Sequence, residues 1–305
     1  MMTPMGMSEA DIAGEADSWA ARLLDQGYCI VPGAIAPAKV AGLAADLAGD
    51  FEKTPFCEGG FYGDRTKRFG RLLARSRLMA EFVLDQRILG IVERVLGPWC
   101  DTIQLNLTQA IALHPGALPQ LPHRDQDMWR GQIGEIEYLV NIMWPFTPYR
   151  LANGATLVWP GSHGRRALDA DRAIEDPIAA EIDPGSALIF LGSTLHGAGG
   201  NRSHVPRRGM IVSYCLGWLK PYENQWLAYP PEIARHFEPE LAALVGYRQH
   251  RPNLGNYEGQ CPSILLQDAP PERLGAIDAL RPDQQEQIEG FVEEQRAGQI
   301  ARASQ

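Results

Sequence analysis

The sequence predicts a mainly β protein, an antiparallel sandwich or barrel with flanking helices, and three observations support this fold class. Between residues 101 and 220, short runs of apolar residues alternate with polar ones, which is the period of a β-strand. Turn-forming Gly, Pro, Asn and Asp residues separate these runs, and no helical stretches alternate with them as in a parallel α/β sheet. Outside this region the apolar spacing is helical. We expect one domain over residues 1–305, with a mainly helical part over 1–100, a β-barrel core over 101–220 and a helical part over 221–305.

The first hundred residues contain three stretches with helical spacing of apolar residues. Ser8 is a candidate N-cap for the first helix. Residues 28–31 then have the pattern of a short strand, a second helix begins near Pro37, and a third stretch covers residues 79–95. The basic run from Arg65 to Arg75 is interpreted as a solvated helix face, with a position near a substrate pocket as the alternative.

The central part contains five strand-like runs. In the first, Ile103, Leu105 and Leu107 alternate with polar residues, which is typical of a half-buried strand. The other four runs cover residues 138–144, 156–159, 186–190 and 209–218. Helical spacing returns after Trp218, and residues 267–305, with eight acidic and four basic residues, are interpreted as a solvated helix.

Charge and composition favour a small-molecule partner. The formal net charge of −9 at pH 7 disfavours nucleic acid, and no basic patch offsets it. No apolar run approaches the roughly 18 residues of a membrane span, and the first residues lack the features of a secretory signal. The five cysteines form no C-x-x-C pair. We therefore expect a cytoplasmic protein that binds neither nucleic acid nor membrane, and we also consider a homodimer.

The segment around His123 and Asp125 is the most informative one. If it forms a strand, both side chains project to the same face and offer a nitrogen and an oxygen to one metal ion. The alternative is a surface His and Asp beside a turn. A third ligand could come from His163, His196 or His204, and we choose His196 because it directly follows an apolar strand. Two His and one carboxylate are typical of non-haem Fe(II) oxygenases.

These motifs and those around them resemble the phytanoyl-CoA dioxygenase family, in particular a natural-product branch found in bacteria and fungi. The resemblance rests on His123-x-Asp125, the run Asn153-Gly154-Ala155-Thr156, Pro160-Gly161-Ser162-His163, His196-Gly197, Asn201-Arg202-Ser203 and Pro206-Arg207-Arg208. It implies a double-stranded β-helix, or jelly roll, that binds Fe(II) and 2-oxoglutarate.

The resemblance also implies roles for individual residues. His123, Asp125 and His196 match the iron ligands, which carry the catalysis. Arg207, eleven positions after the distal histidine, matches the arginine that binds the far carboxylate of 2-oxoglutarate. Gln120 and Thr156 match further co-substrate ligands. Some family members have a serine two positions after the distal histidine, where this chain has Ala198, so the number of donors to that carboxylate stays open.

The implied reaction uses O2 and converts 2-oxoglutarate to succinate and CO2 while a substrate is oxidised. An intact Asp125 favours hydroxylation, desaturation or a related oxidation over halogenation. We expect a mostly apolar, mid-sized substrate. Five side chains are candidates for lining its pocket, each with the protein core as the alternative: Met128, Trp129, Trp144, Trp218 and Trp226. Two other hypotheses are a cupin-like metalloenzyme without 2-oxoglutarate and a catalytically silent binding protein on the same barrel.

Overall fold

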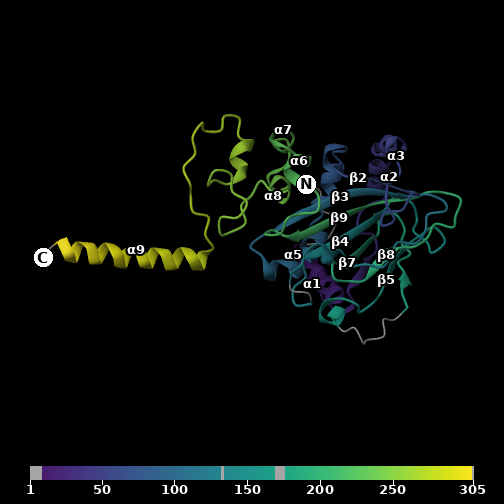
Figure 1. Cartoon of the computed structure of the whole chain (residues 1–305), viewed down its shortest axis with the longest axis horizontal. Helices are drawn as coiled ribbons and strands as arrows, with labels where there is room; N and C mark the ends of the chain where they lie inside the picture. Colours follow the sequence, from purple (N-terminus) through teal and green to yellow (C-terminus); the bar gives the residue numbers. More distant parts are fainter. Residues whose placement is uncertain (1–8, 132–133, 169–175, 304–305) are drawn as a thin grey trace.

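Two antiparallel sheets form the centre of the protein in a computed structural model, which describes residues 9–131, 134–168 and 176–303 (Figure 1). The large sheet has six strands in the order β1-β7-β4-β9-β3-β2, and the small one has the order β6-β5-β8. The strands are β1 (Tyr28–Val31), β2 (Thr66–Phe69), β3 (Ile103–Leu113), β4 (Leu139–Pro145), β5 (Thr156–Val158), β6 (Ile178–Ala179), β7 (Ala187–Leu191), β8 (His196–Ala198) and β9 (Arg207–Leu216). The predicted mainly β jelly roll is confirmed.

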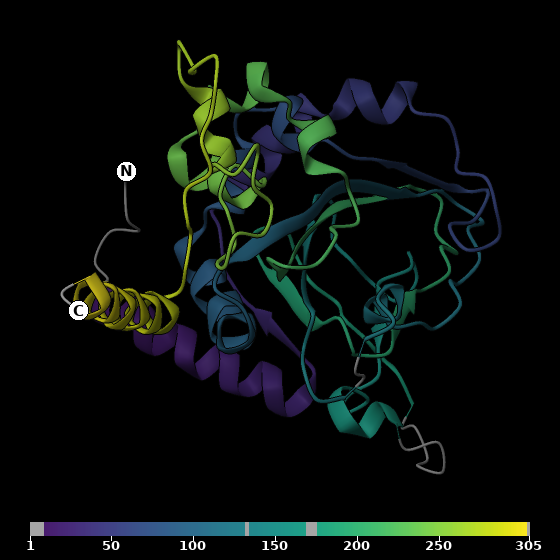
Figure 2. The same cartoon turned by 60° about the vertical axis from the view of Figure 1, so that its left-hand side comes forward.

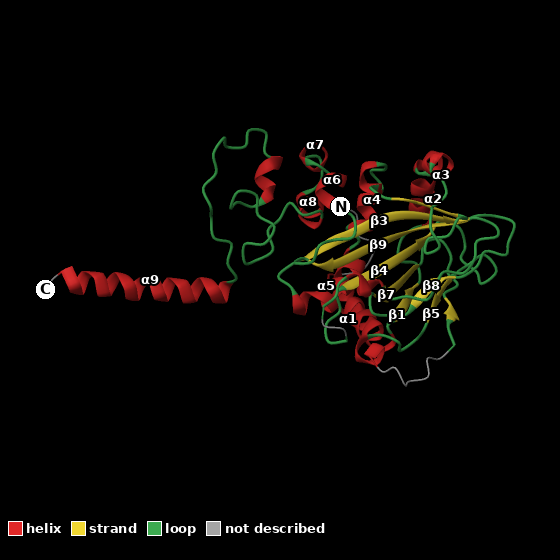
Figure 3. Cartoon of the chain, in the orientation of Figure 1, coloured by secondary structure: helices red, strands yellow, loops and turns green. Residues whose placement is uncertain are grey.

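The helices lie outside the sheets, as the colouring in Figure 3 shows. They are α1 (Glu9–Gln26), α2 (Pro37–Asp46), α3 (Ala48–Lys53), α4 (Met79–Val83), α5 (Gln86–Leu96), α6 (Gln225–Ala228), α7 (Pro231–Ala234), α8 (Pro239–Leu244) and α9 (Pro282–Ala303). The expected third helix is two helices, because Asp85 is extended and its side chain caps α5 by accepting a hydrogen bond from the Ile88 amide. The proposed N-cap Ser8 lies outside the described residues.

Two apolar layers enclose the large sheet. The outer layer packs α1 and α5 against residues such as Val140 and Val212, and Figure 2 shows α1 in purple along this side. The inner layer lies between the two sheets and includes Met143, Phe190 and Ile211. Because neighbouring strand residues face opposite layers, strand β4 is buried at all seven positions. The inner layer is where the site described below is built.

A β-bulge in β3 corrects one prediction. The pairing of β3 with β9 shifts between Leu105 and Leu107, so Asn106 is the additional residue. Leu105 therefore packs in the outer layer and Leu107 in the inner layer, although simple alternation puts both on one face. The amide of Asn106 is fully buried and donates a hydrogen bond to Ser213 of β9 over 3.0 Å.

The basic run was wrongly interpreted as a helix face. Residues 66–69 form β2, which pairs with β3 at one edge of the large sheet, while β1 forms the other edge. The mainly helical first part thus supplies both edge strands. Period-2 alternation within β2 turns the side chains of Lys67 and Arg68 to opposite sides. The structure supports the alternative interpretation for Arg68, which lines a cavity.

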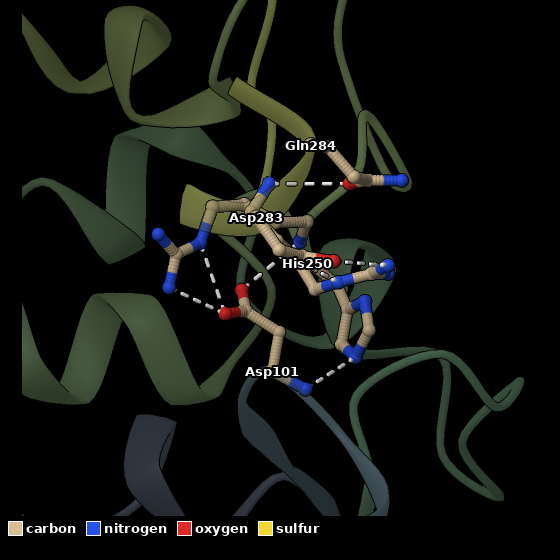
Figure 4. A network of polar contacts seen from close by, with 6 residues as sticks. Asp101, His250, Asp283 and Gln284 are labelled. Atoms are coloured by element: carbon tan, nitrogen blue, oxygen red, sulfur yellow. Dashed lines mark hydrogen bonds and ion pairs between the residues drawn. The ribbon is translucent and has the colours of Figure 1, made fainter. Parts of the chain in front are cut away.

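The C-terminal part is only partly helical, contrary to the prediction. The described residues 245–281 contain no α-helix, and a polar network ties them to the start of β3 (Figure 4). Asp101 accepts hydrogen bonds from the Arg251 guanidinium over 2.6 and 2.9 Å, and its amide donates to Nε2 of His250 over 3.0 Å. Helix α9 follows and projects away from the sheets, as the interpretation of a solvated helix expects (Figure 1).

Candidate active site

His123, Asp125 and His196 meet at the edge of the small sheet. His123 and His196 form a reciprocal backbone pair, with N–H···O distances of 2.9 and 3.0 Å, which extends β8 by one antiparallel bridge. The sequence analysis placed Asp125 on a strand, and this was wrong. Asp125 begins the 3₁₀ turn Asp125–Met128. The turn follows the extended residue Arg124 and brings the carboxylate beside both imidazoles.

The hydrogen bonds of the two rings leave one nitrogen of each directed at Asp125. Nδ1 of His123 donates to the Leu121 carbonyl over 2.8 Å, and Nδ1 of His196 donates to the Thr194 carbonyl over 3.0 Å. A carbonyl can only accept, so the proton lies on Nδ1 and the lone pair on Nε2. The Nε2 atoms are 3.4 Å and 3.6 Å from the Asp125 oxygens, and the three potential ligand atoms lie within 4.8 Å of one another.

The electrostatics of the three groups suit a cation. Burial raises the pKa of Asp125, but the neighbouring His196 and His123 and a hydrogen bond from Asn141 outweigh it and hold the pKa at about 2. Burial lowers the pKa of His196. Burial also lowers that of His123, but the hydrogen bond and charge of Asp125 raise it overall. The site therefore holds one ionised carboxylate next to a buried imidazole that favours its neutral form.

A cavity of about 430 Å³ opens in front of the three residues. Its wall combines residues of the inner layer with residues of β2 and the segment before it, of the segment around His123 and Asp125, of β8 and of the segment after β9. The lining includes Phe61, Tyr62, Arg68, Leu107, Gln109, Ile111, Gln120, His123, Asp125, Met128, Met143, Thr156, Phe190, His196, Ala198, Arg207, Ile211 and Tyr222.

Arg207 lines this cavity, and no carboxylate among the described residues pairs with it. Only 2% of the residue is exposed, and its guanidinium stacks 4.2 Å from the centre of the Tyr149 ring and donates to the Gly154 carbonyl over 2.6 Å. Its Nε has no hydrogen-bond partner among the described residues. Burial lowers the pKa of Arg207, yet a guanidinium stays charged. Arg208 points the other way, to Glu52 at the surface.

Arg68 is a second cation in the cavity, and the sequence analysis placed its run near a substrate pocket only as the alternative. It donates to Gln109 over 3.1 Å, stacks 4.8 Å from the centre of the Tyr62 ring, and forms no ion pair with any described carboxylate. Burial lowers its pKa, and the charge of Asp125 opposes this shift. The sequence of β2, Thr-Lys-Arg-Phe, does not alternate between apolar and polar residues, so it gave no signal for this position.

The two smaller co-substrate candidates also line the cavity. Gln120 pairs with β8. Its backbone N–H donates to the Ala198 carbonyl over 2.9 Å, and its side-chain oxygen accepts from the Ala198 backbone N–H over 3.3 Å. Thr156 of β5 is 5% exposed and pairs with Ala198 of β8. The expected ligands thus lie around one cavity, but no hydroxyl stands at position 198.

The tryptophans expected at the substrate pocket lie elsewhere. Of the five candidates only Met128 lines the cavity. Trp129 and Trp218 turn outwards and donate to the carbonyls of Lys220 and Trp99. Trp144 is buried in the outer layer, and Trp226 is exposed and donates to the Gly246 carbonyl. Each indole N–H is hydrogen-bonded or buried away from the inner layer. No sequence pattern distinguishes such tryptophans from ones that line a pocket.

The competing histidines are not near the carboxylate. Nε2 of the buried His163 lies 2.8 Å from the Leu24 carbonyl, which joins the turn after β5 to α1. His204 is exposed in the loop before β9. In contrast, a residue that sequence reasoning missed contacts the site: Asn141 of β4 donates to Oδ2 of Asp125 over 3.0 Å.

Known proteins share both the sequence and the fold. Dioxygenase cdmD of Talaromyces verruculosus is 31% identical over 194 residues, which cover 61% of this chain and 63% of that protein. Multifunctional dioxygenase ausE of Emericella nidulans is 28% identical over 263 residues, which cover 81% and 88%.

Among solved structures, the epimerase SnoN in complex with Fe3+, alpha ketoglutarate and nogalamycin RO has a TM-score of 0.54 at 20% identity, and the match covers 67% of this chain and 85% of that chain. At this identity the likeness shows the fold alone. The family model for phytanoyl-CoA dioxygenase (PhyH) matches residues 23–209, which include all three potential metal ligands. The chain therefore belongs to the phytanoyl-CoA dioxygenase family.

Proposed function

We propose that the protein is an Fe(II)- and 2-oxoglutarate-dependent dioxygenase that oxidises a mostly apolar small molecule and releases succinate and CO2. The observation that carries this proposal is the position of His123, Asp125 and His196 on a cavity that also holds the unpaired cation Arg207. The relatives are dioxygenases, and SnoN was crystallised with Fe3+ and alpha ketoglutarate.

The donor set fits a divalent iron ion. Two imidazole nitrogens and one carboxylate oxygen, all directed into one space, are the ligands typical of non-haem Fe(II) oxygenases. The backbone carbonyls that hold both Nδ1–H groups fix the tautomer that a metal requires. His123, Asp125 and His196 would hold the ion, and the cavity leaves its other side accessible to co-substrate and O2.

The two buried arginines match a ligand with two carboxylates. Arg207, with a guanidinium fork suited to a carboxylate, would bind the far carboxylate of 2-oxoglutarate beside Thr156. Arg68, whose charge acts on Asp125, would bind the carboxylate nearer the metal, and Gln120 would add a side-chain amide. When bound, iron and 2-oxoglutarate supply the oxidant derived from O2. The cupin alternative without 2-oxoglutarate has no use for two buried arginines that pair with no described carboxylate.

The rest of the cavity favours an apolar substrate. Phe61, Leu107, Met128 and Ile211 supply apolar surface. At the same wall the hydroxyls of Tyr62 and Tyr222 contact each other. One hydroxyl donates and the other keeps its proton, so the pair can still donate to one oxygen of a substrate. We infer a mid-sized natural product with a hydrogen-bonding oxygen, oxidised by hydroxylation, desaturation or a related reaction, since Asp125 is retained.

Metal titration tests the proposal. His123→Ala, Asp125→Ala and His196→Ala are each expected to abolish Fe(II) binding under argon and iron-dependent succinate formation, because each removes one of three protein ligands. Circular dichroism checks that the fold is intact. His204 is an exposed histidine away from the site, so the His204→Ala variant is the matched control and should bind Fe(II) as the wild type does. Unchanged Fe(II) affinity in any of the three variants would contradict that ligand.

The other sequence-based expectations stay predictions. They are a single domain over residues 1–305, a cytoplasmic location, no nucleic-acid or membrane partner, and a homodimer. The described residues contain no helix with the length and apolar character needed to cross a membrane.

A further inference from the structure

We propose that Asn141 is a positioning residue that fixes the orientation of the Asp125 carboxylate and so determines how tightly the site holds its metal ion. This inference rests on the proposed function, because it assigns Asn141 a role toward the metal ligands. Asn141 would act through Asp125 and would not touch the metal or the co-substrate.

Asn141 is a polar residue where the fold favours an apolar one. It is the third of seven residues of β4, from Leu139 to Pro145, that pair in register with β9, and all other residues of β4 are apolar. Its exposed fraction is 1%. Met143, its neighbour on the same face of β4, and Phe190, its partner on β7, belong to the inner layer. A buried amide in such a layer is unfavourable unless its polar atoms have partners.

Within the described part of the chain the Asn141 side-chain amide has one hydrogen-bond partner, and this partner is a metal-ligand candidate. Nδ2 donates to Oδ2 of Asp125 over 3.0 Å, whereas Oδ1 has no hydrogen-bond partner among the described residues. Reversing the amide would place its oxygen against the carboxylate, where two acceptors repel. Asp125 thus sets the orientation of Asn141, and the unpaired Oδ1 is the cost of keeping a donor at this point.

The same hydrogen bond acts on Asp125. This residue begins a 3₁₀ turn, with no strand pairing of its own, and its oxygens lie 3.4 Å from Nε2 of His123 and 3.6 Å from Nε2 of His196. With a metal ion on Nε2 and the proton on Nδ1, neither imidazole would have a donor left for the carboxylate. Asn141 supplies one to Oδ2, which leaves the lone pairs of Oδ1 for a metal ion. Partners of this kind typically change metal affinity 10- to 100-fold.

Binding of Co(II), used as a spectroscopic substitute for Fe(II), tests the inference. Asn141→Leu removes the donor and also the unpaired oxygen, so we expect an unchanged or higher melting temperature together with Co(II) affinity weakened by about 10- to 100-fold and an altered Co(II) absorption spectrum. Asn141→Ala, which needs no additional space, is expected to weaken Co(II) binding in the same way and covers the case in which leucine does not fit.

Ser213→Ala is the matched control. Ser213 pairs with Asn141 on the neighbouring strand and accepts a hydrogen bond from the Asn106 side-chain amide. In the part of the chain that the structure describes it has no hydrogen bond or ion pair with the three ligands, so its loss should lower the melting temperature and leave Co(II) affinity and spectrum unchanged. Wild-type Co(II) affinity and spectrum in both Asn141 variants would overturn the inference. Co(II) binding that also survives Asp125→Ala would instead overturn the proposed metal site.

Discussion

Replacement of Arg207 by alanine should sharply raise the 2-oxoglutarate concentration that the enzyme requires. Arg207 is 2% exposed, and its Nε has no partner among the described residues, so a bound carboxylate would meet a desolvated donor. A hydrogen bond to a charged group contributes about 1.5 to 3 kcal/mol. For the two parallel hydrogen bonds between a guanidinium and a carboxylate we take about 3 kcal/mol, which is less than the sum of two full contributions. At 1.4 kcal/mol per tenfold change, this corresponds to an increase of about 100-fold.

Arg208→Ala is the matched control for this prediction. The two residues are neighbours on β9, but Arg208 pairs with Glu52, whose side chain is 73% exposed, and such a surface pair contributes about 0 to 1 kcal/mol. The 2-oxoglutarate requirement should therefore stay at the wild-type value. Arg207→Lys keeps the charge without the planar fork and should give an intermediate requirement.

Succinate formation measured against 2-oxoglutarate concentration compares the three variants with the wild type. A second assay needs no turnover: 2-oxoglutarate with a metal should raise the melting temperature of the wild type and of Arg208→Ala, but not of Arg207→Ala. The reasoning is refuted if Arg208→Ala has the larger effect, or if Arg207→Ala leaves both measurements unchanged.

Two further predictions concern stability. Burial raises the pKa of Glu137 to about 7, against the hydrogen bond from Ser193, so its carboxyl is more basic in the folded than in the unfolded protein. Its contribution is therefore fully present below the unfolded pKa of 4.5 and is lost as the pH rises through about 7. In denaturant titrations between pH 4.5 and about 7, the free energy of unfolding of Glu137→Gln should fall less than that of the wild type, by about 2 to 3 kcal/mol. If the free energies of the two proteins change in parallel with pH, the burial argument is contradicted. Asp101→Asn should weaken the contact with Arg251 that ties residues 245–281 to β3, giving faster proteolysis within that segment; a cleavage rate equal to that of the wild type would show that other contacts hold it.

Local sequence patterns alone identified most strands and the antiparallel arrangement. Period-2 runs and turn residues locate β4, β5, β7 and β9 within a few residues, because strand side chains alternate and turns need specific backbone angles. The candidate ligands His123 and Asp125 were also singled out from the sequence, although on a strand where the structure has a turn. His196 was chosen as the third candidate because it follows an apolar strand, whereas Arg207 depended on a resemblance to a family, since no local pattern joins segments that far apart.

Only the tertiary structure decided which side chains share the cavity. The bulge at Asn106 reverses the facing of β3, and pairing at the sheet edge turns the run containing Arg68 into a strand that faces the site. Trp129 and Trp218 look like pocket residues in the sequence but turn outwards to backbone carbonyls. Which face a side chain occupies depends on register and on partners far away in the chain, and a single sequence specifies these contacts only through the complete fold.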